Sequence, residues 1–377
     1  MAVISSFLFL KYEFLLTNNK YSKNINSSAF ELSRYNANLV KSENLELQLS
    51  NALDEKNGIS IFGSSELTNE SEYISYNFFP NKIGVRASSF GHAYHQNFAI
   101  YCQLLAFKDK LKNAKVCIFL SPGWFETEGT NIEAFLEFVR PNFLKKIIKD
   151  QTINIESKIS IGEFLLKNED KIENPSPAIN YFLEIVKFKN IPFLNNYSLN
   201  KYKLFENIKY QKSSNDSKNA ISDTSKIDWD EELKINEEKF ISNIKSNNIF
   251  VNDEYYTKFL KPKNGKLIKA TFSSLAPKEN QELKDFKLLV KLLKEQNCDA
   301  SFVIQTLNPY YYDNLENFNP ILKEIVCDLK EAKFPFLNVF TTSKQEYIPG
   351  TLNDVMHVGD VGWININHFL YKTYVQK

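Results

Sequence analysis

The stretch "IFGSSELTNE" (residues 61–70) runs from an apolar pair into a glycine, two serines and an acidic residue. Only 11 of the 377 residues are glycine, so the position of Gly63 directly before paired serines is informative. Glycine at the end of a strand usually permits a tight turn. A serine held on such a turn is one of the ways in which a fold presents a nucleophile. The stretch therefore predicts a strand followed by a turn that displays Ser64 and Ser65.

Five short apolar runs have the composition of β-strands: residues 58–62, 82–87, 114–120, 300–306 and 335–341. Several of them are continuous rather than alternating, as expected for parallel strands that are covered on both faces. Between these runs, apolar residues recur at helical spacing. One apolar face consists of Tyr94, Phe98, Tyr101 and Leu105, and another consists of Phe286, Leu289, Val290 and Leu293. This alternation predicts an α/β fold with a doubly wound, mainly parallel sheet flanked by helices.

The middle of the chain, residues 125–280, interrupts this alternation with helical stretches rich in Asn, Lys and Glu. A polar run at residues 210–230 has the composition of an exposed loop. We therefore predict a single α/β domain over residues 1–377, with residues 125–280 as a helical insertion or cap between the third and fourth strands.

Composition excludes several classes of function. With 46 Lys and Arg against 45 Asp and Glu, the formal net charge is +1, which gives no support for nucleic-acid binding. The four cysteines form no CxxC pair: Cys102, Cys117, Cys298 and Cys327. Free buried thiols are the favoured interpretation, no metal site or cofactor is predicted, and two disulfides remain open if the protein is secreted.

Candidate catalytic residues follow the predicted strands, where ligands collect in open α/β sheets. A hydroxyl nucleophile needs a base to take its proton and donors to hold an oxyanion. Of only four histidines in the chain, His357 is the natural base, because Asp354 lies three residues earlier and can orient its imidazole. Gly91 is predicted to open a helix and to offer a backbone N–H to the developing negative charge.

Each of these elements also has an ordinary structural explanation. Serine pairs at strand ends are usually turn or N-cap residues, and an isolated D-x-x-H is more often a cap or a surface pair. The consistent order of the elements at strand ends, with Asp and His near the C-terminus, favours a catalytic set. This arrangement resembles that of the SGNH, or GDSL-type, hydrolases.

Four motifs make a more specific resemblance: "FGSSEL" (62–67), "SPGWF" (121–125), "NNIFVNDEYY" (247–256) and "DVMHVGDVGW" (354–363). Together they resemble the DltD family, which works last in the D-alanylation of teichoic acids. That family has a comparable FGSSEL start, a glycine followed by a Q-containing helix, an SPQWF-like motif and a D-x-x-H-x-G-x-x-G-W ending. The resemblance covers nearly the whole chain in order.

The resemblance implies a role for each matching residue. Ser65 becomes the nucleophile, with Ser64 in the preceding position, and Asp354 and His357 complete the triad. Gly91 becomes an oxyanion donor.

Further positions concern the oxyanion site and its neighbourhood. Gln96 matches the family glutamine, although a hydrogen bond on the helix face is the favoured interpretation. The glutamine of SPQWF is Gly123 here, so a backbone N–H near Gly123 or Trp124 would have to replace its side chain. His95 stands where a smaller polar residue is usual, and we expect it on the helix surface. Trp124 and Trp363 are expected in supporting roles, since large aromatic residues are more often core than ligand contacts.

The function that the resemblance implies is transfer of D-alanyl groups by a serine acyltransferase or esterase. The implied partners are a teichoic acid polymer, the D-alanyl carrier protein, membrane partners and the membrane surface, at the outer face of the cell membrane. The apolar run Ala2–Leu10 is shorter than the about 20 residues that span a bilayer, so we expect the family's N-terminal anchor to be absent or truncated. Two alternatives remain open: an SGNH-type carbohydrate or lipid esterase, and a non-catalytic module that binds the carrier protein or the polymer.

Overall fold

A computed structural model describes residues 44–68, 71–126, 128–187, 227–262 and 267–376. The described residues belong to two compact units. The larger unit comprises those within Leu32–Arg140 and Asn219–Lys377, and the smaller unit comprises those within Met1–Glu31 and Pro141–Lys218. The apolar run Ala2–Leu10 and most of the polar run 210–230 lie outside the described residues.

The larger unit is built on a parallel sheet of five strands: β1 (Ile59–Gly63), β2 (Ala87–Gly91), β3 (Lys115–Leu120), β5 (Asp299–Ile304) and β7 (Phe336–Asn338). Their order is β2-β1-β3-β5-β7, and every neighbouring pair is parallel. All residues of β1 and β2 are buried, which agrees with continuous apolar runs rather than alternating ones. The sheet confirms the predicted α/β class and is consistent with an SGNH-like fold.

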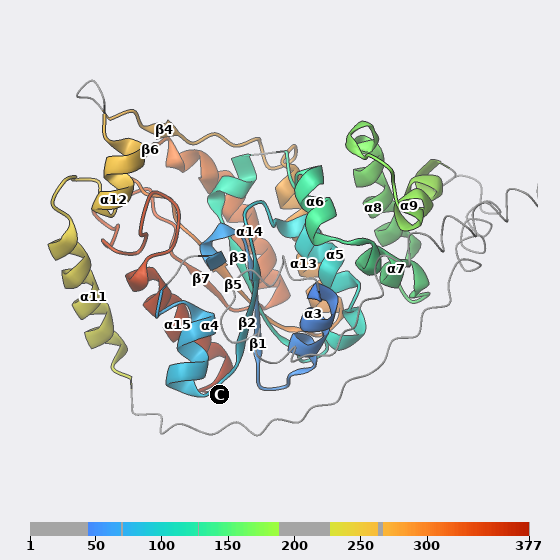
Figure 1. Ribbon diagram of the computed structural model, residues 1–377, viewed down its shortest axis with the longest axis horizontal. Helices are drawn as coiled ribbons and strands as arrows, with labels where there is room; N and C mark the ends of the chain where they lie inside the picture. Colours follow the sequence, from blue (N-terminus) through green and yellow to red (C-terminus); the bar gives the residue numbers. More distant parts are fainter. Residues whose placement is uncertain (1–43, 69–70, 127, 188–226, 263–266, 377) are drawn as a thin grey trace, which may run out of the picture. The chain divides into compact units, whose positions relative to one another are not determined.

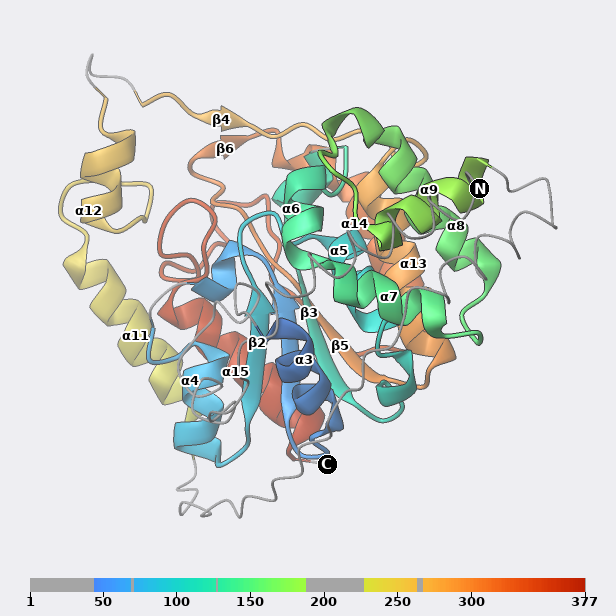
Figure 2. The same cartoon turned by 45° about the vertical axis from the view of Figure 1, so that its right-hand side comes forward.

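Helices cover both faces of this sheet (Figures 1 and 2). One face carries α3 (Leu45–Asp54), α5 (Asn97–Leu105), α13 (Gln281–Glu295) and α14 (Asn319–Ala332). The other carries α4 (Ser75–Phe78), α11 (Trp229–Asn243) and α15 (Asp360–Tyr374). Coverage on both faces is the doubly wound arrangement that the alternation of strands and helices predicted.

The core on the α4 and α15 side joins these layers. Trp363 in α15 is fully buried, and its ring centroid lies 5.6 Å from that of Phe119 in β3. Ile59 and Ile61 of β1 belong to the same apolar cluster. The helix that contains the end of the C-terminal motif is therefore fixed directly against the central strands.

Two predicted boundaries are wrong. The first two residues of the expected strand 82–87 belong to a π-helical turn, η3 (Phe79–Ile83), and β2 begins only at Ala87. The turn ends at Gly84, whose φ of 75° is a left-handed conformation that breaks the apolar run.

The second error concerns the helix after β2. Gly91 ends β2 rather than opening a helix, and α5 begins at Asn97. Tyr94 has a φ of 67° and is 68% exposed, so it does not belong to the apolar face of α5.

The remaining elements of the larger unit are short. They are η2 (Ser65–Thr68), η4 (Lys108–Lys110), η5 (Pro122–Glu126), α6 (Ile132–Phe138), α12 (Asp253–Tyr255), η7 (Tyr256–Leu260), η8 (Leu315–Phe318) and a separate parallel pair, β4 (Ala270–Thr271) and β6 (Tyr312–Asp313). All four cysteines are free; Cys102, Cys117 and Cys298 are buried as expected, whereas Cys327 is exposed.

The described part of the smaller unit is helical, with α7 (Pro141–Lys149), α8 (Ile155–Lys167), η6 (Glu169–Lys171) and α9 (Pro177–Lys187). Helices α8 and α9 approach closely at Gly162, where a Cβ atom would lie 2.4 Å from the carbonyl oxygen of Phe182. The single domain over residues 1–377 and the cap over residues 125–280 stay predictions.

Candidate active site

The candidate site lies at the carboxyl end of β1, the strand at which the sheet topology changes direction. From β1 the chain adds β2 on one side and then β3 on the other. In open α/β sheets, ligands bind outside the strand ends at such a switch point. Gly63 is the last residue of β1, and Ser65 is the first residue of η2.

Gly63 and Gly91 permit the turn after β1 to pack tightly. A Cβ atom on Gly63 would lie 2.2 Å from Oε1 of Glu66. A Cβ atom on Gly91, which pairs with Gly63 in the sheet, would lie 2.6 Å from Cδ1 of Leu67 and 2.9 Å from the carbonyl oxygen of Ser64. Both positions therefore need glycine for space.

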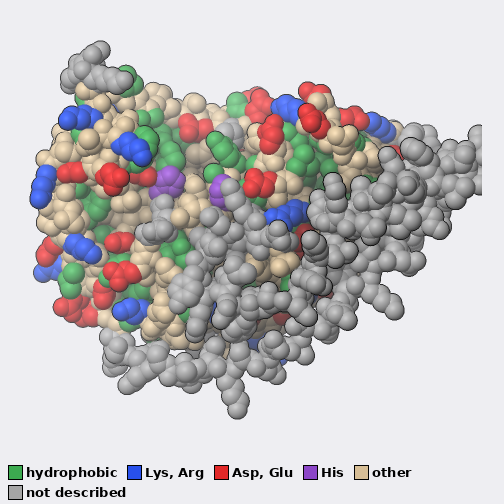
Figure 3. All heavy atoms as spheres, viewed as in Figure 1, with side chains coloured by type: hydrophobic (Ala, Val, Ile, Leu, Met, Phe, Trp, Pro, Cys, Tyr) green, Lys and Arg blue, Asp and Glu red, His purple; other side chains and the backbone are tan. Residues whose placement is uncertain are grey.

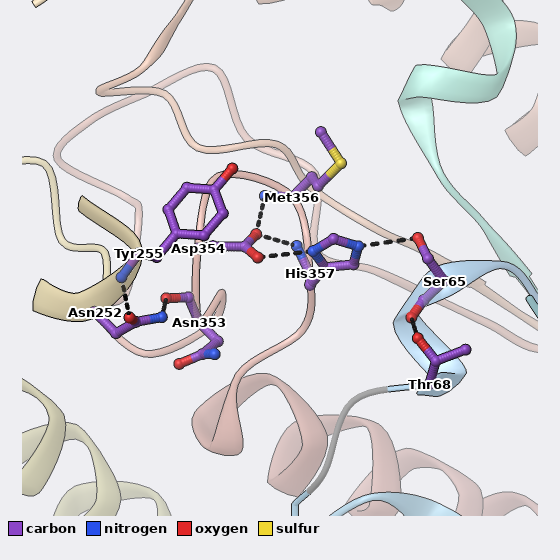
Figure 4. Close-up of polar contacts among 8 residues, drawn as sticks. All are labelled: Ser65, Thr68, Asn252, Tyr255, Asn353, Asp354, Met356 and His357. Atoms are coloured by element: carbon purple, nitrogen blue, oxygen red, sulfur yellow. Dashed lines mark hydrogen bonds and ion pairs between the residues drawn. The ribbon is translucent and has the colours of Figure 1, made fainter. Parts of the chain in front are cut away.

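Ser65, His357 and Asp354 form one continuous chain of hydrogen bonds (Figure 4). Nε2 of His357 lies 2.9 Å from Oγ of Ser65, and Nδ1 of His357 lies 2.7 Å from Oδ2 of Asp354. The Asp354 carboxylate can only accept a hydrogen bond, so Nδ1 of neutral His357 carries the proton and donates a hydrogen bond to this carboxylate. Nε2 is then the basic nitrogen that faces Ser65.

The loop that carries Asp354 and His357 is held by its own backbone and by a neighbouring segment. Oδ1 of Asp354 accepts the backbone N–H groups of Met356 and His357, each at 2.8 Å. The N–H of Asn353 donates to the His357 carbonyl at 2.8 Å. Asn252, from the motif "NNIFVNDEYY", donates both its backbone N–H and its side-chain Nδ2 to the Asn353 carbonyl, at 3.0 and 2.9 Å (Figure 4).

The electrostatics of the pair favour its ionised form. Burial alone would raise the pKa of Asp354, but the hydrogen bond and charge of His357, together with two backbone N–H groups, bring this pKa below its ordinary value. The hydrogen bond to Asp354 raises the pKa of His357, against the opposing effect of burial, and the charges of Asp354 and Glu66 raise it further. Such an environment stabilises an imidazolium beside Ser65.

The Ser64 hydroxyl is turned away from this chain of hydrogen bonds. Ser64 is 5% exposed, and its Oγ donates to the carbonyl of His92 at 3.0 Å. Ser64 is therefore a residue of the turn, next to the site but outside the hydrogen-bonded set.

The residues expected near an oxyanion occupy the neighbouring strand ends. Gln96 caps α5 and donates from Nε2 to the Trp124 carbonyl at 3.5 Å. Gly123 lies in η5, where a Cβ atom would meet only Oγ of Ser121, at 3.7 Å. The Trp124 N–H donates to the Ser121 carbonyl at 3.1 Å, so this amide is already used within its turn. The oxyanion roles of Gly91 and Gly123 stay predictions.

The prediction of a surface position for His95 is wrong. The side chain is fully buried, with Nδ1 lying 3.1 Å from the Gly63 carbonyl oxygen and Nε2 lying 3.0 Å from Oε1 of Gln103. Burial lowers the pKa of His95 to about 4, although both hydrogen bonds act in the opposite direction. His95 supports the end of β1 from within the core.

Trp124 and Trp363 both lie in the core, at 6% and 0% exposure. Trp363 stands on α15, directly after the loop of His357, and packs against Phe119 of the central sheet. It therefore connects the end of the histidine loop to the strand beside β1.

Sequence reasoning missed Glu66 as a residue of the site. It follows Ser65 directly, is 3% exposed, and accepts the backbone N–H of Ser64 at 2.5 Å. Its position in "FGSSEL" was the available signal, but a glutamate beside a turn gives no local sign of burial.

On the face drawn in Figure 3, basic and acidic side chains are interspersed over the described surface, and histidine side chains reach it. This distribution agrees with the formal charge of +1. Among the described residues, no group of three or more His, Cys, Asp or Glu is placed to hold a metal ion. No helix in the described part of the chain is both long and apolar enough to cross a membrane.

Comparison with known proteins places this chain in a family. A family model described as "DltD protein" matches residues 34–375. Protein DltD of Bacillus subtilis (strain 168) is 24% identical over 344 residues, covering 84% of this chain and 82% of the relative. Protein DltD of Staphylococcus aureus (strain NCTC 8325 / PS 47) is 21% identical over 322 residues, covering 83% of this chain and 80% of the relative. The chain therefore belongs to the DltD family, whose members are involved in the D-alanylation of teichoic acids.

Proposed function

We propose that this protein is a serine acyltransferase that passes D-alanyl groups to teichoic acid through an acyl-Ser65 intermediate. The observation that carries the proposal is the continuous hydrogen-bond chain from Oγ of Ser65 through His357 to Asp354, in a member of the DltD family. Neutral serine is a weak nucleophile, and an adjacent base of this kind activates it.

In the first half of the proposed reaction, Oγ of Ser65 attacks the carbonyl carbon of the D-alanyl donor while Nε2 of His357 takes the hydroxyl proton. The tetrahedral intermediate collapses, the bond to the leaving group of the donor breaks, and the imidazolium returns its proton to that group. In the second half, a hydroxyl of the acceptor loses its proton to His357 and attacks the acyl carbon. The ester to Ser65 then breaks, and Oγ regains the proton.

Asp354 supports both halves without exchanging a proton. Its carboxylate accepts from Nδ1 of His357 and stabilises the positive charge that forms on the ring. Gly91 and Gly123 are the proposed sources of backbone N–H groups for the oxyanion, since they belong to the strand-end segments on either side of β1.

The proposed partners are the teichoic acid polymer, the D-alanyl carrier protein and membrane partners of the D-alanylation system, at the outer face of the cell membrane. Fractionation of cells that express the native gene should recover the protein with the membrane, open to external protease. Recovery from the cytosol alone would contradict this location.

We also propose that residues 125–280 form a helical cap of the site. Recovery of an independently folded fragment from this middle region would contradict the proposal.

The direct test of the function measures D-alanyl esters on teichoic acid in cells that carry wild-type protein or Ser65→Ala. We expect the ester content to fall to the level of a deletion strain in Ser65→Ala. With purified protein, a serine-directed fluorophosphonate should label Ser65 in the wild type and leave Ser65→Ala unlabelled. Label on Ser64 instead would move the nucleophile by one residue.

One observation favours a non-catalytic role as the second candidate. The glutamine that the family motif SPQWF provides is Gly123 here, and the space beside Gly123 is open. A module that only binds carrier protein or polymer would keep D-alanylation intact in Ser65→Ala. The same cell assay therefore separates the two functions.

The remaining alternative is a general SGNH-type esterase. Such an enzyme would hydrolyse many short acyl esters without preference for D-alanyl esters.

A further inference from the structure

Glu66 is a buried carboxylate directly beside the proposed nucleophile, and the mechanism above does not use it. Its side chain is 3% exposed. Acidic side chains are almost never buried to this degree unless they are paired. The Glu66 carboxylate must therefore have partners that compensate for the loss of water.

Its partners are mainly the backbone of the turn itself. Oε1 accepts the N–H of Ser64 at 2.5 Å. Burial raises the pKa of the Glu66 carboxyl, while hydrogen bonds from the N–H groups of Ser64 and Glu66, the charge of His357 and the side chain of Gln305 act against that rise. The Glu66 carboxylate therefore turns back toward the backbone N–H groups of Ser64 and of Glu66 itself, the residues on either side of Ser65.

The shape of the turn depends on this contact. Any Cβ on Gly63 would lie 2.2 Å from Oε1 of Glu66, so the absence of a side chain at Gly63 makes room for the carboxylate. A second buried side chain contacts the same turn: Nδ1 of His95 lies 3.1 Å from the carbonyl oxygen of Gly63. The junction between β1 and Ser65 is therefore contacted by one buried side chain at the Gly63 carbonyl and by another at the Ser64 N–H.

We propose that Glu66 is a positioning residue, whose carboxylate clamps the backbone of the nucleophile turn and so sets the Ser65 hydroxyl against Nε2 of His357. This inference rests on the proposed function of Ser65. Glu66 acts through the Ser64 backbone and through its charge, and it exchanges no proton with the substrate. Catalytic geometry held by side chains of this kind is sensitive to errors of about 1 Å.

Two substitutions separate position from charge. Glu66→Gln keeps the size of the side chain but removes the negative charge, while Glu66→Asp keeps the charge and shortens the reach to Ser64. The matched control is Glu282→Gln, because Glu282 is also fully buried and accepts a backbone N–H, that of Asn97, at 2.9 Å. Each variant is compared with the wild type for the rate of fluorophosphonate labelling at Ser65 as a function of pH.

We expect Glu66→Gln to lower the limiting labelling rate, because a neutral amide oxygen accepts the Ser64 N–H more weakly than a carboxylate does. We expect Glu66→Asp to lower it at least about tenfold, because the shorter side chain no longer reaches the Ser64 N–H. The acidic groups that act on His357 are Asp354 and Glu66, so removal of one charge should also move the midpoint of the pH profile to lower pH. Glu66→Asp should lose rate but keep a midpoint nearer that of the wild type. Glu282→Gln should change neither quantity.

If folded Glu66→Asp labels within twofold of the wild-type limiting rate, the proposal is overturned. If Glu66→Asp does not fold, Glu66→Ala, which has no acceptor for the Ser64 N–H, decides by the same criterion. Hydrogen exchange of the peptide covering residues 62–67 provides a readout independent of chemistry. We expect faster exchange at the Ser64 amide in Glu66→Asp than in wild type and Glu282→Gln. Failure of the wild type to label would reject the proposed function, whereas unchanged exchange at Ser64 would reject the clamp.

Discussion

Nε2 of His357 lies 2.9 Å from Oγ of Ser65, although 292 positions separate the two residues in the chain. The contact joins the turn after the central strand β1 to the loop before the last helix, α15. Both ends of the folded chain must therefore be correctly packed before the pair exists. Three residues that meet in this way should behave as one functional unit.

The first prediction is that Ser65→Ala and His357→Ala each reduce the proposed acyl transfer by at least about 10³-fold. The double variant should lose little more, because either change alone already disables the shared step. The measurement is single-turnover transfer of D-alanine by folded, purified variants. Losses that multiply in the double variant would show that the two residues act separately.

The second prediction concerns Asp354→Asn, which should reduce the rate by up to about 10⁴-fold. An amide donates as well as accepts, so it can select the wrong tautomer of His357 and also removes the charge that stabilises the imidazolium. Asp354→Asn should label more slowly with a fluorophosphonate but still at Ser65. A rate equal to that of the wild type would remove Asp354 from the proposed mechanism.

The third prediction concerns pH. The reaction needs neutral His357, and the pKa of this residue is raised above its ordinary 6.5, so the rate should rise with pH through a midpoint above 6.5. Asp354→Asn should move that midpoint downward, because it removes the main cause of the increase in pKa. Rates of fluorophosphonate labelling between about pH 5 and 9 measure both midpoints. A lower midpoint in the wild type than in Asp354→Asn would contradict the assigned pair.

The pKa shifts of His357 and Asp354 also determine how the free energy of unfolding changes with pH. A raised pKa in the folded state means that protonated His357 stabilises the protein below about pH 6.5, and this contribution is lost as pH rises through the raised value. For Asp354, whose pKa is lowered, the contribution is present above about pH 3.8 and is lost as pH falls through the lowered value.

The fourth prediction concerns the packing of Trp363. Trp363→Ala should lower the free energy of unfolding by about 3–5 kcal/mol, because it empties a fully buried site against Phe119. Trp363→Phe should cost less, since it keeps an aromatic ring and removes the indole N–H, which has no hydrogen-bond partner among the described residues. Denaturant unfolding checks the order of the two variants. Equal stability of Trp363→Ala and the wild type would exclude the anchoring role.

Much of the fold could be predicted because strands β1 and β3 are buried on both faces and therefore read as continuous apolar runs. The start of β2 could not, because Ile83 and Val85 look like strand residues until the left-handed Gly84 separates them. Asp354 and His357 were visible as a pair because their contact spans only three residues. Their approach to Ser65 depends on strand order, which local periodicity does not contain. The position of all three residues after predicted strands suggested it, and the family resemblance made it specific.

Buried polar residues were the main source of error at the site. His95 was expected at the surface because nothing near it in the sequence shows that its two ring nitrogens form hydrogen bonds with the Gly63 carbonyl and with Gln103. Glu66 was overlooked for the same reason, since its partner is a backbone N–H of a turn. Burial of such groups is decided by tertiary hydrogen bonds rather than by the residue type.

The last prediction uses Gly91 and Gly123, the two glycines that the sequence analysis predicted as oxyanion donors. Gly91→Ala should destabilise the protein by about 1–3 kcal/mol, because the new methyl group would lie 2.9 Å from the backbone carbonyl oxygens of both Gly63 and Ser64. Backbone in the central sheet cannot move as a flexible side chain can, so the turn that carries Ser65 must shift instead. The rate of labelling at Ser65 should therefore fall together with the stability.

Gly123→Ala is the matched control for that substitution, because its methyl group would meet only the Ser121 hydroxyl, at the ordinary contact distance of 3.7 Å. We expect its free energy of unfolding to lie within about 1 kcal/mol of the wild type, or slightly above it, since alanine restricts the unfolded chain more than glycine does. Denaturant unfolding and fluorophosphonate labelling of the two variants side by side make the comparison. If Gly91→Ala labels at the wild-type rate, or if Gly123→Ala is the more damaging change, then close packing of β2 against the Ser65 turn does not control the nucleophile.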